Sequence, residues 1–340
     1  MIREAIARLV ERQPLTRAEA RDTLREIMRG EATPAQIAGF LTALRMAGET
    51  ADIIAGAAEA MREAVTPVVT RRPHLVDTCG TGGDGAHTFN ISTTAAFVAA
   101  GAGAAVAKHG NRGVSSKSGS ADVLAALGVK TDCDPAVMTR CLDDIGVAFL
   151  FAPVLHPAMK HAIGPRREIG IRTLFNILGP LTNPAGARRG VLGVYNDTLL
   201  RLVADASHAL GAERLFVVHG SDGLDEITTT GPSTVAEVTP AGVNVGILDP
   251  RDLGLSTASP ADLRGGEPSE NAAITRAILS GEKGPRRDIV RVNAAAASAA
   301  AGLAADLREG LARAAESVDS GAARVKLDEL VRATTASAQA

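Results

Sequence analysis

The chain has 340 residues, which is enough for one large domain and a smaller one, and its 46% hydrophobic and 22% charged residues are ordinary for a globular protein. A formal net charge of −2, a single Tyr and no Trp argue against a general affinity for nucleic acid or for an anionic membrane. Three scattered cysteines and a charged start without a leucine-rich stretch favour a cytoplasmic protein over a secreted one.

Residues 1 to about 66 are expected to be entirely helical. Apolar residues recur there at helical spacing, as at Ile37 and Leu41. Thr33-Pro34 has the sequence of a helix cap followed by a first-turn proline. The stretch 66–73 is a natural joint to the part that follows.

From residue 74, short apolar runs alternate with helical stretches, which is the pattern of a mostly parallel sheet flanked by helices. The expected strands are 74–79, 104–108, 147–152, 189–195 and 214–219. The expected helices between them are 92–102, 118–127, 135–145 and 198–210. Two polar strands are expected within 234–248, and Ala-rich helices over 269–334. The fold class is therefore α/β, with a small all-helical part at the N-terminus and a large part built on a mostly parallel sheet.

A segment rich in Arg, Pro and Gly, from about 156 to 187, interrupts this alternation. We expect it to be an insertion that packs back on the N-terminal helices.

Two glycine-rich loops follow the first two expected strands. The first is Gly80-Thr81-Gly82-Gly83-Asp84-Gly85, and the second runs from Lys108 to Ser116. Glycines let backbone N–H groups close on an anion, and the helix N-termini that follow favour negative charge. The pair of loops predicts a site for a substrate with more than one phosphate.

Other interpretations of these loops remain open. Gly80, Gly82 and Gly85 have the spacing of a dinucleotide-binding fingerprint. That fingerprint needs an acidic residue roughly twenty positions further on to bind the ribose, but no acidic residue follows until Asp122. A purely structural glycine turn is a further possibility. The run Ser115 to Ser118 does not match a phosphate loop of ATPases, because no glycine precedes Lys117.

Hydroxyl and carboxylate side chains near the same edge of the sheet suggest a metal. Asn90-Ile91-Ser92-Thr93 stands at an expected helix start, and Asp222-Gly223-Leu224-Asp225-Glu226 follows the strand 214–219. Magnesium commonly joins one or two carboxylates to substrate phosphates. The alternatives are an ordinary helix cap and a solvated acidic turn.

Two further side chains are candidates for ligand contact. Arg166, in the inserted segment, could grip a carboxylate through its planar guanidinium, although most arginines are surface charges. His109 is the histidine placed best to touch a ligand, because it stands in the second loop beside Lys108.

These motifs, together with Ser118 to Asp122 and Arg172 to Pro184, resemble those of the anthranilate phosphoribosyltransferases of tryptophan biosynthesis, which share the nucleoside phosphorylase-like architecture. The resemblance extends over nearly the whole chain. It implies a helical domain of residues 1–66, joined by about 166–187, and a large α/β domain of residues 74–165 and 188–340. It also implies a homodimer formed through the helical domain.

The reaction implied by the resemblance transfers the 5-phosphoribosyl group of 5-phosphoribosyl 1-pyrophosphate to the amine of anthranilate and releases pyrophosphate. The resemblance implies Mg²⁺, up to two ions per subunit, held by Ser92, Asp225 and Glu226, and anthranilate held by Gly80, Asn111 and Arg166. The sugar diphosphate is expected to contact Gly80, Gly83, Asp84, Thr88, Asn90, Ile91, Ser92, Thr93, Lys108, His109, Gly110, Asn111, Arg112, Gly113, Ser115, Ser116 and Ser120.

Because the attacking aromatic amine is neutral at pH 7, no obligatory general base is expected, and positioning should carry most of the rate. Two alternatives stay open. A pyrimidine-nucleoside phosphorylase would share the architecture, but phosphorolysis does not call for a metal that bridges a diphosphate. A non-catalytic relative that binds nucleic acid fits poorly with the weak net charge.

Overall fold

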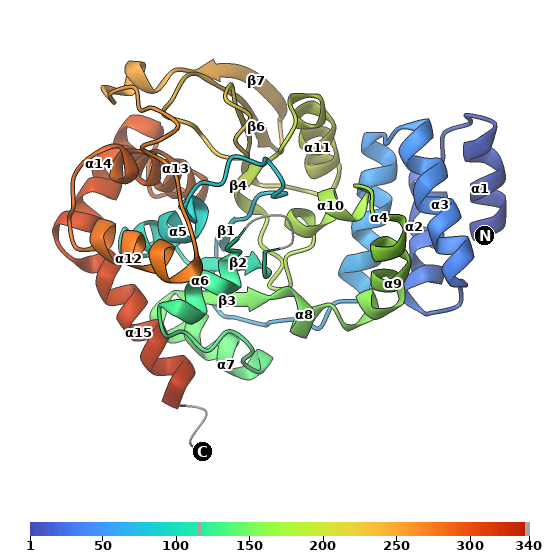
Figure 1. The fold of residues 1–340 in the computed structure, drawn as a ribbon, viewed down its shortest axis with the longest axis horizontal. Coiled ribbons are helices and arrows are strands. Elements are labelled where there is room, and N and C mark those ends of the chain that lie inside the picture. The colour runs from blue at the N-terminus through green and yellow to red at the C-terminus, as the bar shows by residue number, and fades with distance from the viewer. Residues whose placement is uncertain (114–116, 337–340) are drawn as a thin grey trace.

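A computed structural model of the chain describes residues 1–113 and 117–336. Figure 1 shows the N-terminal helices at one end of the molecule and a central sheet with its helices at the other. The first four helices are α1 (Ile2–Val10), α2 (Arg17–Met28), α3 (Pro34–Ala47) and α4 (Ala51–Glu63). The predicted helical start of the chain is confirmed.

The helix boundaries follow from local chemistry. The Thr33 side chain accepts a hydrogen bond from the backbone N–H of Gln36, and the Gln36 side chain accepts from the Thr33 N–H, with Pro34 in the first turn. The same reciprocal arrangement joins Thr16 and Glu19 at the start of α2. These caps satisfy N–H groups that have no partner inside the helix.

One seven-stranded sheet forms the centre of the molecule, in the order β3-β2-β1-β4-β5-β6-β7. Neighbouring strands are parallel from β3 to β5, whereas β6 and β7 are antiparallel. The strands are β1 (Val76–Thr78), β2 (Val106–Gly110), β3 (Val147–Phe151), β4 (Arg189–Gly193), β5 (Arg214–Gly220), β6 (Ser233–Thr239) and β7 (Gly242–Leu248). The predicted mostly parallel sheet is therefore confirmed, including the pair of strands within 234–248.

Helices cover both faces of this sheet. Those between the strands are α5 (Ile91–Gly101), α6 (Ser120–Ala126), α7 (Pro135–Arg140) and α11 (Asp197–Ala209). Those after the sheet are α12 (Pro268–Leu279), α13 (Pro285–Ala301), α14 (Leu307–Asp319) and α15 (Ala322–Ala336), preceded by the 3₁₀ turn η4 (Pro250–Leu253). None of the helices in the described ranges is long and apolar enough to cross a bilayer.

The expected helix 135–145 differs from the structure in its second half. It becomes a π-helical turn, η1 (Cys141–Ile145), which ends at Gly146 in the left-handed conformation. The wider turn moves the chain directly into β3, and a glycine tolerates the positive φ of 84° that the ending needs.

The segment between β3 and β4 contains only short helices and one longer one. They are α8 (Ala152–Leu155), η2 (Pro157–Met159), α9 (Lys160–Ile169), α10 (Phe175–Leu178) and η3 (Gly179–Leu181). Helix α9 packs against α2 and α3, and α10 packs against α4. The chain thus leaves the sheet, runs along the N-terminal helices and returns to the sheet (Figure 1).

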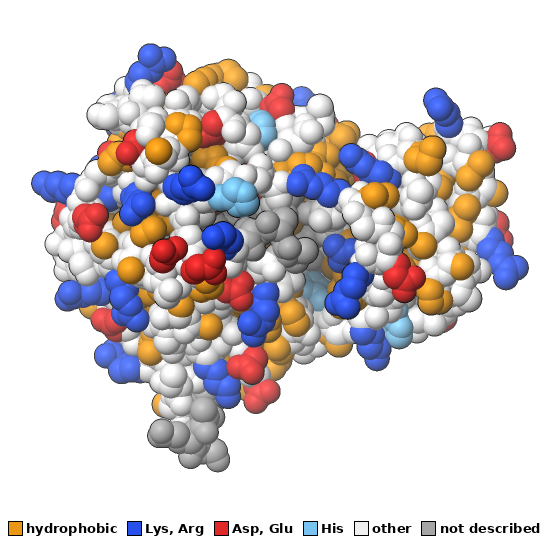
Figure 2. Space-filling model, viewed as in Figure 1, with side chains coloured by type: hydrophobic (Ala, Val, Ile, Leu, Met, Phe, Trp, Pro, Cys, Tyr) orange, Lys and Arg blue, Asp and Glu red, His pale blue; other side chains and the backbone are white. Residues whose placement is uncertain are grey.

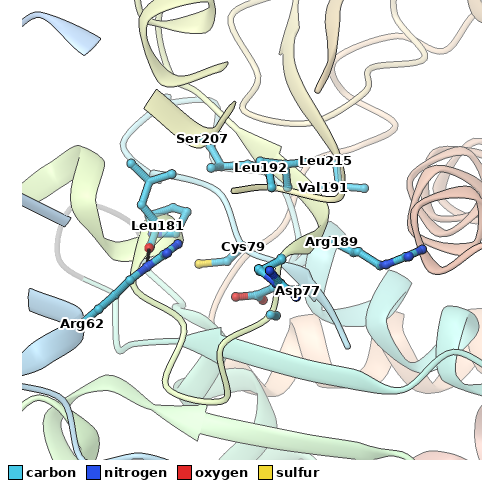
Figure 3. Close-up of a pocket in the computed structure, with 13 residues that line it drawn as sticks. Arg62, Asp77, Cys79, Leu181, Arg189, Val191, Leu192, Ser207 and Leu215 are labelled. Atoms are coloured by element: carbon cyan, nitrogen blue, oxygen red, sulfur yellow. Dashed lines mark hydrogen bonds between the residues drawn. The ribbon is translucent and has the colours of Figure 1, made fainter. Parts of the chain in front are cut away.

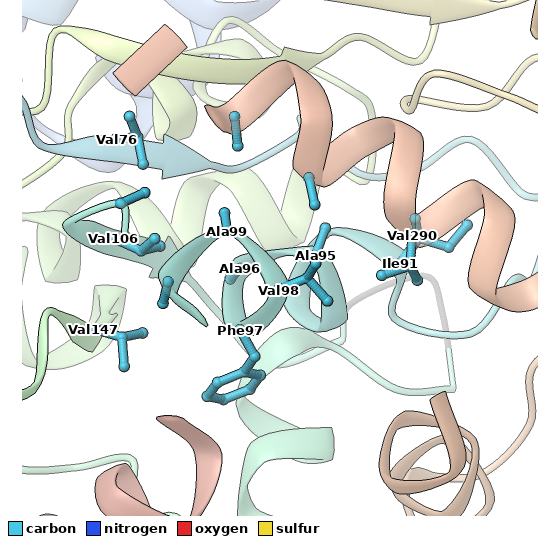
Figure 4. Close-up of a cluster of buried hydrophobic side chains, with 14 of the residues drawn as sticks. Val76, Ile91, Ala95, Ala96, Phe97, Val98, Ala99, Val106, Val147 and Val290 are labelled. Carbon is cyan, nitrogen blue, oxygen red and sulfur yellow. The ribbon is translucent and has the colours of Figure 1, made fainter. Parts of the chain in front are cut away.

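Two buried apolar clusters hold these parts. One fills the space between the sheet, α5 and α13, and it contains Phe97 and Val98 of α5 together with Val76, Val106 and Val147 of three strands (Figure 4). The other joins the N-terminal helices to α11 and the opposite face of the sheet. The carboxyl ends of the parallel strands are left to the loops, which is where open α/β sheets bind ligands.

Candidate active site

The first glycine loop leaves the carboxyl end of β1 and meets the loop that follows β5. The N–H of Gly82 donates to Asp225 Oδ2 at 2.7 Å, across 143 positions of sequence. A Cβ atom at Gly80 would lie 2.4 Å from the same carboxylate oxygen. Gly82 itself has φ +66°, a conformation that favours glycine. Glycine is thus favoured at Gly80 by the nearby acidic side chain and at Gly82 by the positive φ, since a Cβ atom at Gly82 would meet nothing within 4 Å.

The neighbouring carboxylate meets the first turn of α5. The N–H of Ser92 donates to Glu226 Oε1 at 3.0 Å. Asp225 and Glu226 therefore point inward, toward the loop of β1 and the N-terminus of α5, rather than out to solvent. The acidic pair therefore lies beside the first glycine loop and the start of α5.

A small pocket lies at this meeting point. It is lined by Thr78, Gly80, Ser92, Ala95, Val191, Gly193, Asp225, Glu226 and Asn293. These residues come from β1, β4, α5 and α13 and from the loops that follow β1 and β5. The pocket is thus built by the fold and not by one loop alone.

Electrostatics in this pocket favour a cation. Burial raises the pKa of both the Asp225 and the Glu226 carboxyl, and each is raised further by a neighbouring carboxylate, Asp84 and Asp225 respectively. Among the residues that the structure describes, no salt bridge ends at Asp225 or Glu226. Adjacent oxygen donors with unbalanced negative charge are the donor set that Mg²⁺ takes, so the residues fit such an ion.

The second loop is braced through its backbone. Asn111 N–H donates to Ser120 Oγ at 3.1 Å, and Ser120 Oγ donates to the Asn111 carbonyl at 3.2 Å. The Gly113 and Gly119 N–H groups both donate to Asp122 Oδ2, at 2.8 and 2.9 Å. Asn111 and Arg112 are exposed at its surface. Ser115 and Ser116, also predicted to contact phosphate, lie outside the described residues.

Lys108 and His109 are turned into the protein. The Lys108 ammonium is 4% exposed and donates to the Thr78 carbonyl at 2.5 Å, which ties β2 to the end of β1. The His109 ring lies 3.0 Å from the Gly179 carbonyl through Nδ1 and 3.2 Å from His156 Nε2 through Nε2. His109 is therefore engaged with the protein through both ring nitrogens.

The start of α5 is joined to the loop that follows the second glycine motif. Asn90 Nδ2 donates to the Ser118 carbonyl at 3.1 Å, and Asn90 Oδ1 accepts from Asn271 Nδ2 at 2.9 Å. Asn90 occupies the cap position of α5 without a side-chain cap hydrogen bond. Ile91 and Thr93 are buried. Asn90 thus stands at the position of a helix cap, but its side chain does not make the hydrogen bond of a cap.

Thr88 and Asp84 belong to the outer part of the first loop. Thr88 forms an isolated antiparallel bridge with Arg264. The Asp84 carboxylate accepts from the Ala86 N–H at 3.1 Å and adds to the negative charge near Asp225.

Figure 2 shows Lys and Arg side chains on both sides of the hollow between the N-terminal helices and the α/β part. Arg166 lies in the last turn of α9, which packs against α2 and α3. It is half-buried, its guanidinium is 5.0 Å from the centre of the Phe175 ring, and burial lowers its pKa from the ordinary range. Within the described ranges, no hydrogen bond joins Arg166 to Gly80 or Asn111. The neighbouring Arg167 is exposed.

One contact at the site was missed from sequence. Arg172 donates from its guanidinium to the Gly83 carbonyl and stacks 4.1 Å from the centre of the Tyr195 ring. It links the inserted segment to the first glycine loop. Its place at the start of the Arg172 to Pro184 motif was the available signal, and Tyr195 carried none.

A second pocket lies on the opposite face of β1, because Asp77 and Cys79 alternate with Thr78 and Gly80 along the chain (Figure 3). Burial raises the pKa of the Cys79 thiol, which keeps it protonated and unreactive. The Asp77 oxygens accept from the His109 N–H and from Asn183 Nδ2 at 2.7 Å. Asp77, Cys79 and His109 lie close together, but Asp77 and His109 are already paired within the protein.

Comparison with known proteins identifies the family. Residues 72–324 match a model described as the a/b domain of a glycosyl transferase family, and residues 3–65 match the helical bundle domain of a glycosyl transferase family. An anthranilate phosphoribosyltransferase of Moorella thermoacetica is 58% identical over 331 residues, which are 97% of this chain and 98% of that protein.

Solved structures agree in fold. Anthranilate phosphoribosyltransferase of Thermus thermophilus superposes with a TM-score of 0.93 at 46% identity, over 97% of this chain and 99% of that one. The Saccharomyces cerevisiae enzyme in complex with PRPP and Mg gives a TM-score of 0.90 at 29% identity, over 98% of both chains. This chain, with the same two parts and an acidic pair closed on a glycine loop, belongs to the anthranilate phosphoribosyltransferase family.

Proposed function

We propose that this protein transfers the 5-phosphoribosyl group from 5-phosphoribosyl 1-pyrophosphate to the amine of anthranilate, at the carboxyl ends of β1, β2 and β5. The observation that carries the proposal is the contact of Asp225 and Glu226 with the Gly82 and Ser92 N–H groups. These contacts bring the two carboxylates together with the first glycine loop and the N-terminus of α5 in one pocket. The anthranilate phosphoribosyltransferases named above match this chain over nearly their whole length.

The sugar diphosphate is proposed to lie along the two glycine loops. The side chains of Lys108, His109 and Asn90 bond to protein groups, and so do the N–H groups of Gly82 and Gly113, so the diphosphate would have to replace some of these hydrogen bonds. Lys108 contributes its positive charge from beneath the pocket, and its hydrogen bond to Thr78 holds two strand ends at a fixed separation.

Magnesium is proposed to bind at Ser92, Asp225 and Glu226, with up to two ions per subunit. The yeast enzyme has been solved in complex with PRPP and Mg. When bound, the ion supplies positive charge to the leaving diphosphate. The chain's own part is to hold both carboxylates in place: the Gly82 N–H fixes Asp225, and the Ser92 N–H fixes Glu226.

Anthranilate is proposed to bind between Gly80, Asn111 and Arg166. Arg166 is held by the Phe175 ring beneath its guanidinium and offers a planar pair of donors to a carboxylate. The yeast enzyme has also been solved with 4-fluoroanthranilate, at 30% identity to this chain.

The chemical step is proposed to need no general base. The aromatic amine is neutral and nucleophilic at pH 7, and His109 is engaged through both ring nitrogens. The chain binds the amine and the sugar on facing sides of the hollow and orients them, while positive charge that develops on the ribose meets the carboxylates of the pocket.

Three further properties are proposed with this function. The domain boundaries are those predicted, 1–66 with 166–187 and 74–165 with 188–340, supported by α9 and α10 packing on α2, α3 and α4. The protein is a homodimer formed through its N-terminal helices. It works in the cytoplasm, which fits its free cysteines.

The experiment is a fluorescence assay of the purified chain. Anthranilate fluorescence should fall only when 5-phosphoribosyl 1-pyrophosphate and Mg²⁺ are both present, and pyrophosphate should appear in equal amount. Phosphorolysis of a pyrimidine nucleoside, without turnover of anthranilate, would instead favour the related phosphorylase activity.

A further inference from the structure

Helix α13 carries one buried side chain that its apolar neighbours do not explain. Asn293 is 2% exposed and stands before an unbroken run of small buried residues from Ala294 to Ala301. A buried amide costs free energy unless it is hydrogen-bonded, and an alanine would fit such a helix at no such cost. The hydrogen bonds of Asn293 therefore show what it does.

The Asn293 amide bonds to both backbone groups of a single residue in another loop. Its Oδ1 accepts from the Ile227 N–H at 3.0 Å, and its Nδ2 donates to the Ile227 carbonyl at 2.9 Å, across 66 positions of sequence. A third bond runs from Nδ2 to the Ile289 carbonyl, one helical turn earlier, at 2.9 Å. The side chain is thus fixed to its own helix and presents the rest of its amide to the loop.

Ile227 directly follows Glu226, so this pair of bonds sets the position of the acidic loop. The Ile227 N–H belongs to the peptide unit that begins at the Glu226 carbonyl, and a peptide unit is planar and rigid. On the other side, the Asp225 backbone lies so close to β4 that a Cβ atom at Gly193 would be 1.6 Å from the Asp225 carbonyl oxygen. The acidic pair is held between β4 on one side and Asn293 of α13 on the other.

Asn293 also lines the pocket that contains Ser92, Asp225 and Glu226. Because its amide is already bonded to Ile227 and Ile289, it acts through the loop and not as a ligand of the ion. Residues that orient ligands in this way commonly change metal affinity when they are replaced.

We infer that Asn293 is a positioning residue, which holds Glu226 and Asp225 in the geometry that binds the divalent cation. This inference rests on the proposed metal site. It assigns to the alanine-rich helix α13 a role in the site besides packing.

The test uses Mn²⁺ in place of Mg²⁺, with 5-phosphoribosyl 1-pyrophosphate bound to the full chain, and follows free Mn²⁺ by electron paramagnetic resonance. Asn293→Ala should raise the dissociation constant for Mn²⁺ by about 10-fold or more, the usual size of such an effect. The Mg²⁺ concentration for half-maximal turnover should rise in parallel, while the KM for anthranilate stays within about 2-fold. Unchanged Mn²⁺ binding in a folded Asn293→Ala variant would overturn the inference.

Ser298→Ala is the matched control. Ser298 is buried in the same helix, and its Oγ has no hydrogen-bond partner among the described residues, so its loss should leave Mn²⁺ binding unchanged. An equal weakening in this control would mean that any change in α13 disturbs the site, and would also overturn the inference.

Two further variants keep the outcome clear. If Asn293→Ala does not fold, Asn293→Asp has nearly the same shape; its ionised carboxylate cannot donate to Ile227, and weaker Mn²⁺ binding is expected although the added negative charge alone would strengthen it. Asp225→Asn and Glu226→Gln test the metal site itself. If they weaken Mn²⁺ binding and Asn293→Ala does not, only the inference fails; if they too have no effect, the proposed metal site fails with it.

Discussion

At the scale of single residues, the site depends on glycines whose backbone lies close to other side chains. Gly80 and Gly82 stand where the backbone touches the Asp225 carboxylate, and Gly83 lies beneath the Arg172 guanidinium, which would be 3.0 Å from a Cβ atom. The sequence identified these glycines as part of a phosphate loop. It also placed Asp225 and Glu226 near the same edge of the sheet, but the hydrogen bond between Gly82 and Asp225, across 143 positions, is seen only in the structure.

Arg166→Ala tests the proposed anthranilate site. We expect the KM for anthranilate to rise by roughly 10- to 100-fold, as for the loss of one charged hydrogen bond, with little change in the KM for the phosphoribosyl donor. Steady-state kinetics with each substrate varied in turn would measure both. Arg167→Ala, the exposed neighbour, is the control and should behave like the unchanged protein. Equal increases in both KM values would remove Arg166 from this role.

At the scale of elements, the packing of β4 against the loop after β5 depends on Gly193, where any side chain would overlap that loop. The Gly193 carbonyl accepts from the Thr81 N–H at 2.8 Å, while the Asp225 backbone lies against its α-carbon. The end of β4 is therefore fixed to both loops of the site. Nothing in the sequence marks this glycine, since it falls in an ordinary apolar strand.

Gly193→Ala should destabilise the protein by about 1–3 kcal/mol or more, because the added methyl group overlaps the Asp225 backbone and the loop must shift. Urea unfolding would measure the change. Gly39→Ala is the matched control: its Cβ would meet Ile6 at an ordinary 3.7 Å within α3, and it should stabilise by about 0.5–1 kcal/mol. A Gly193→Ala variant as stable as the parent would contradict the packing described.

His109 and His156 join the end of β2 to α8 and η3 as a neutral pair. Because the Gly179 carbonyl can only accept, His109 carries its proton on Nδ1, and its Nε2 then accepts from the Nε2–H of His156. Burial lowers the pKa of His109 to about 3 and that of His156 to about 4. The fold thus keeps both rings neutral where the unfolded chain would protonate them.

The contribution of this pair to stability should therefore fall as the pH is lowered below 6.5, because the unfolded state then binds protons that the folded pair does not. Each ring contributes a slope of up to about 1.4 kcal/mol per pH unit. Buried Asp77, whose pKa is raised to about 6, opposes this trend between about pH 6 and 4, and the buried carboxyls of Asp225 and Glu226, whose pKa values are also raised, oppose it as well, since there the folded state holds the extra protons.

His156→Gln should lower the number of protons taken up on unfolding by about one between pH 6 and 4.5. The slope of the unfolding free energy against pH should then change by about 1.4 kcal/mol per pH unit. Urea titrations of both proteins at several pH values would give the two slopes. Identical slopes would mean that His156 does not titrate as a buried neutral ring.

At the scale of the whole molecule, the N-terminal helices carry the exposed apolar residues expected of a subunit contact. Val10 at the end of α1 is 65% exposed and Met46 in α3 is 83% exposed, and these two helices pack against each other. Single exposed apolar side chains are ordinary, but both stand in the helical part for which the dimer contact is proposed.

If the proposed dimer forms through these helices, Met46→Asp should shift it toward a monomer, because a charge in the contact would be desolvated on association. Light scattering after size-exclusion chromatography would measure the mass at several concentrations. Ile247→Asp, 70% exposed on β7, is the control and should leave the mass unchanged. A Met46→Asp protein with the unchanged dimer mass would exclude this part of the surface.

The sequence by itself determined the elements and their chemistry. Secondary structure followed from local patterns: helical periodicity, caps such as Thr33 with Gln36, and the alternation of strands and helices. The glycine loops and the acidic pair are short motifs, which can be recognised without knowing what lies next to them in the fold. Only the tertiary structure decided which groups face the pocket. Lys108 and His109 turned out to bond within the protein, while Asn293 and Arg172 proved to support the loops. The reason is that hydrogen bonds between residues tens or hundreds of positions apart depend on how the strands order themselves in the sheet, and no local pattern carries that order.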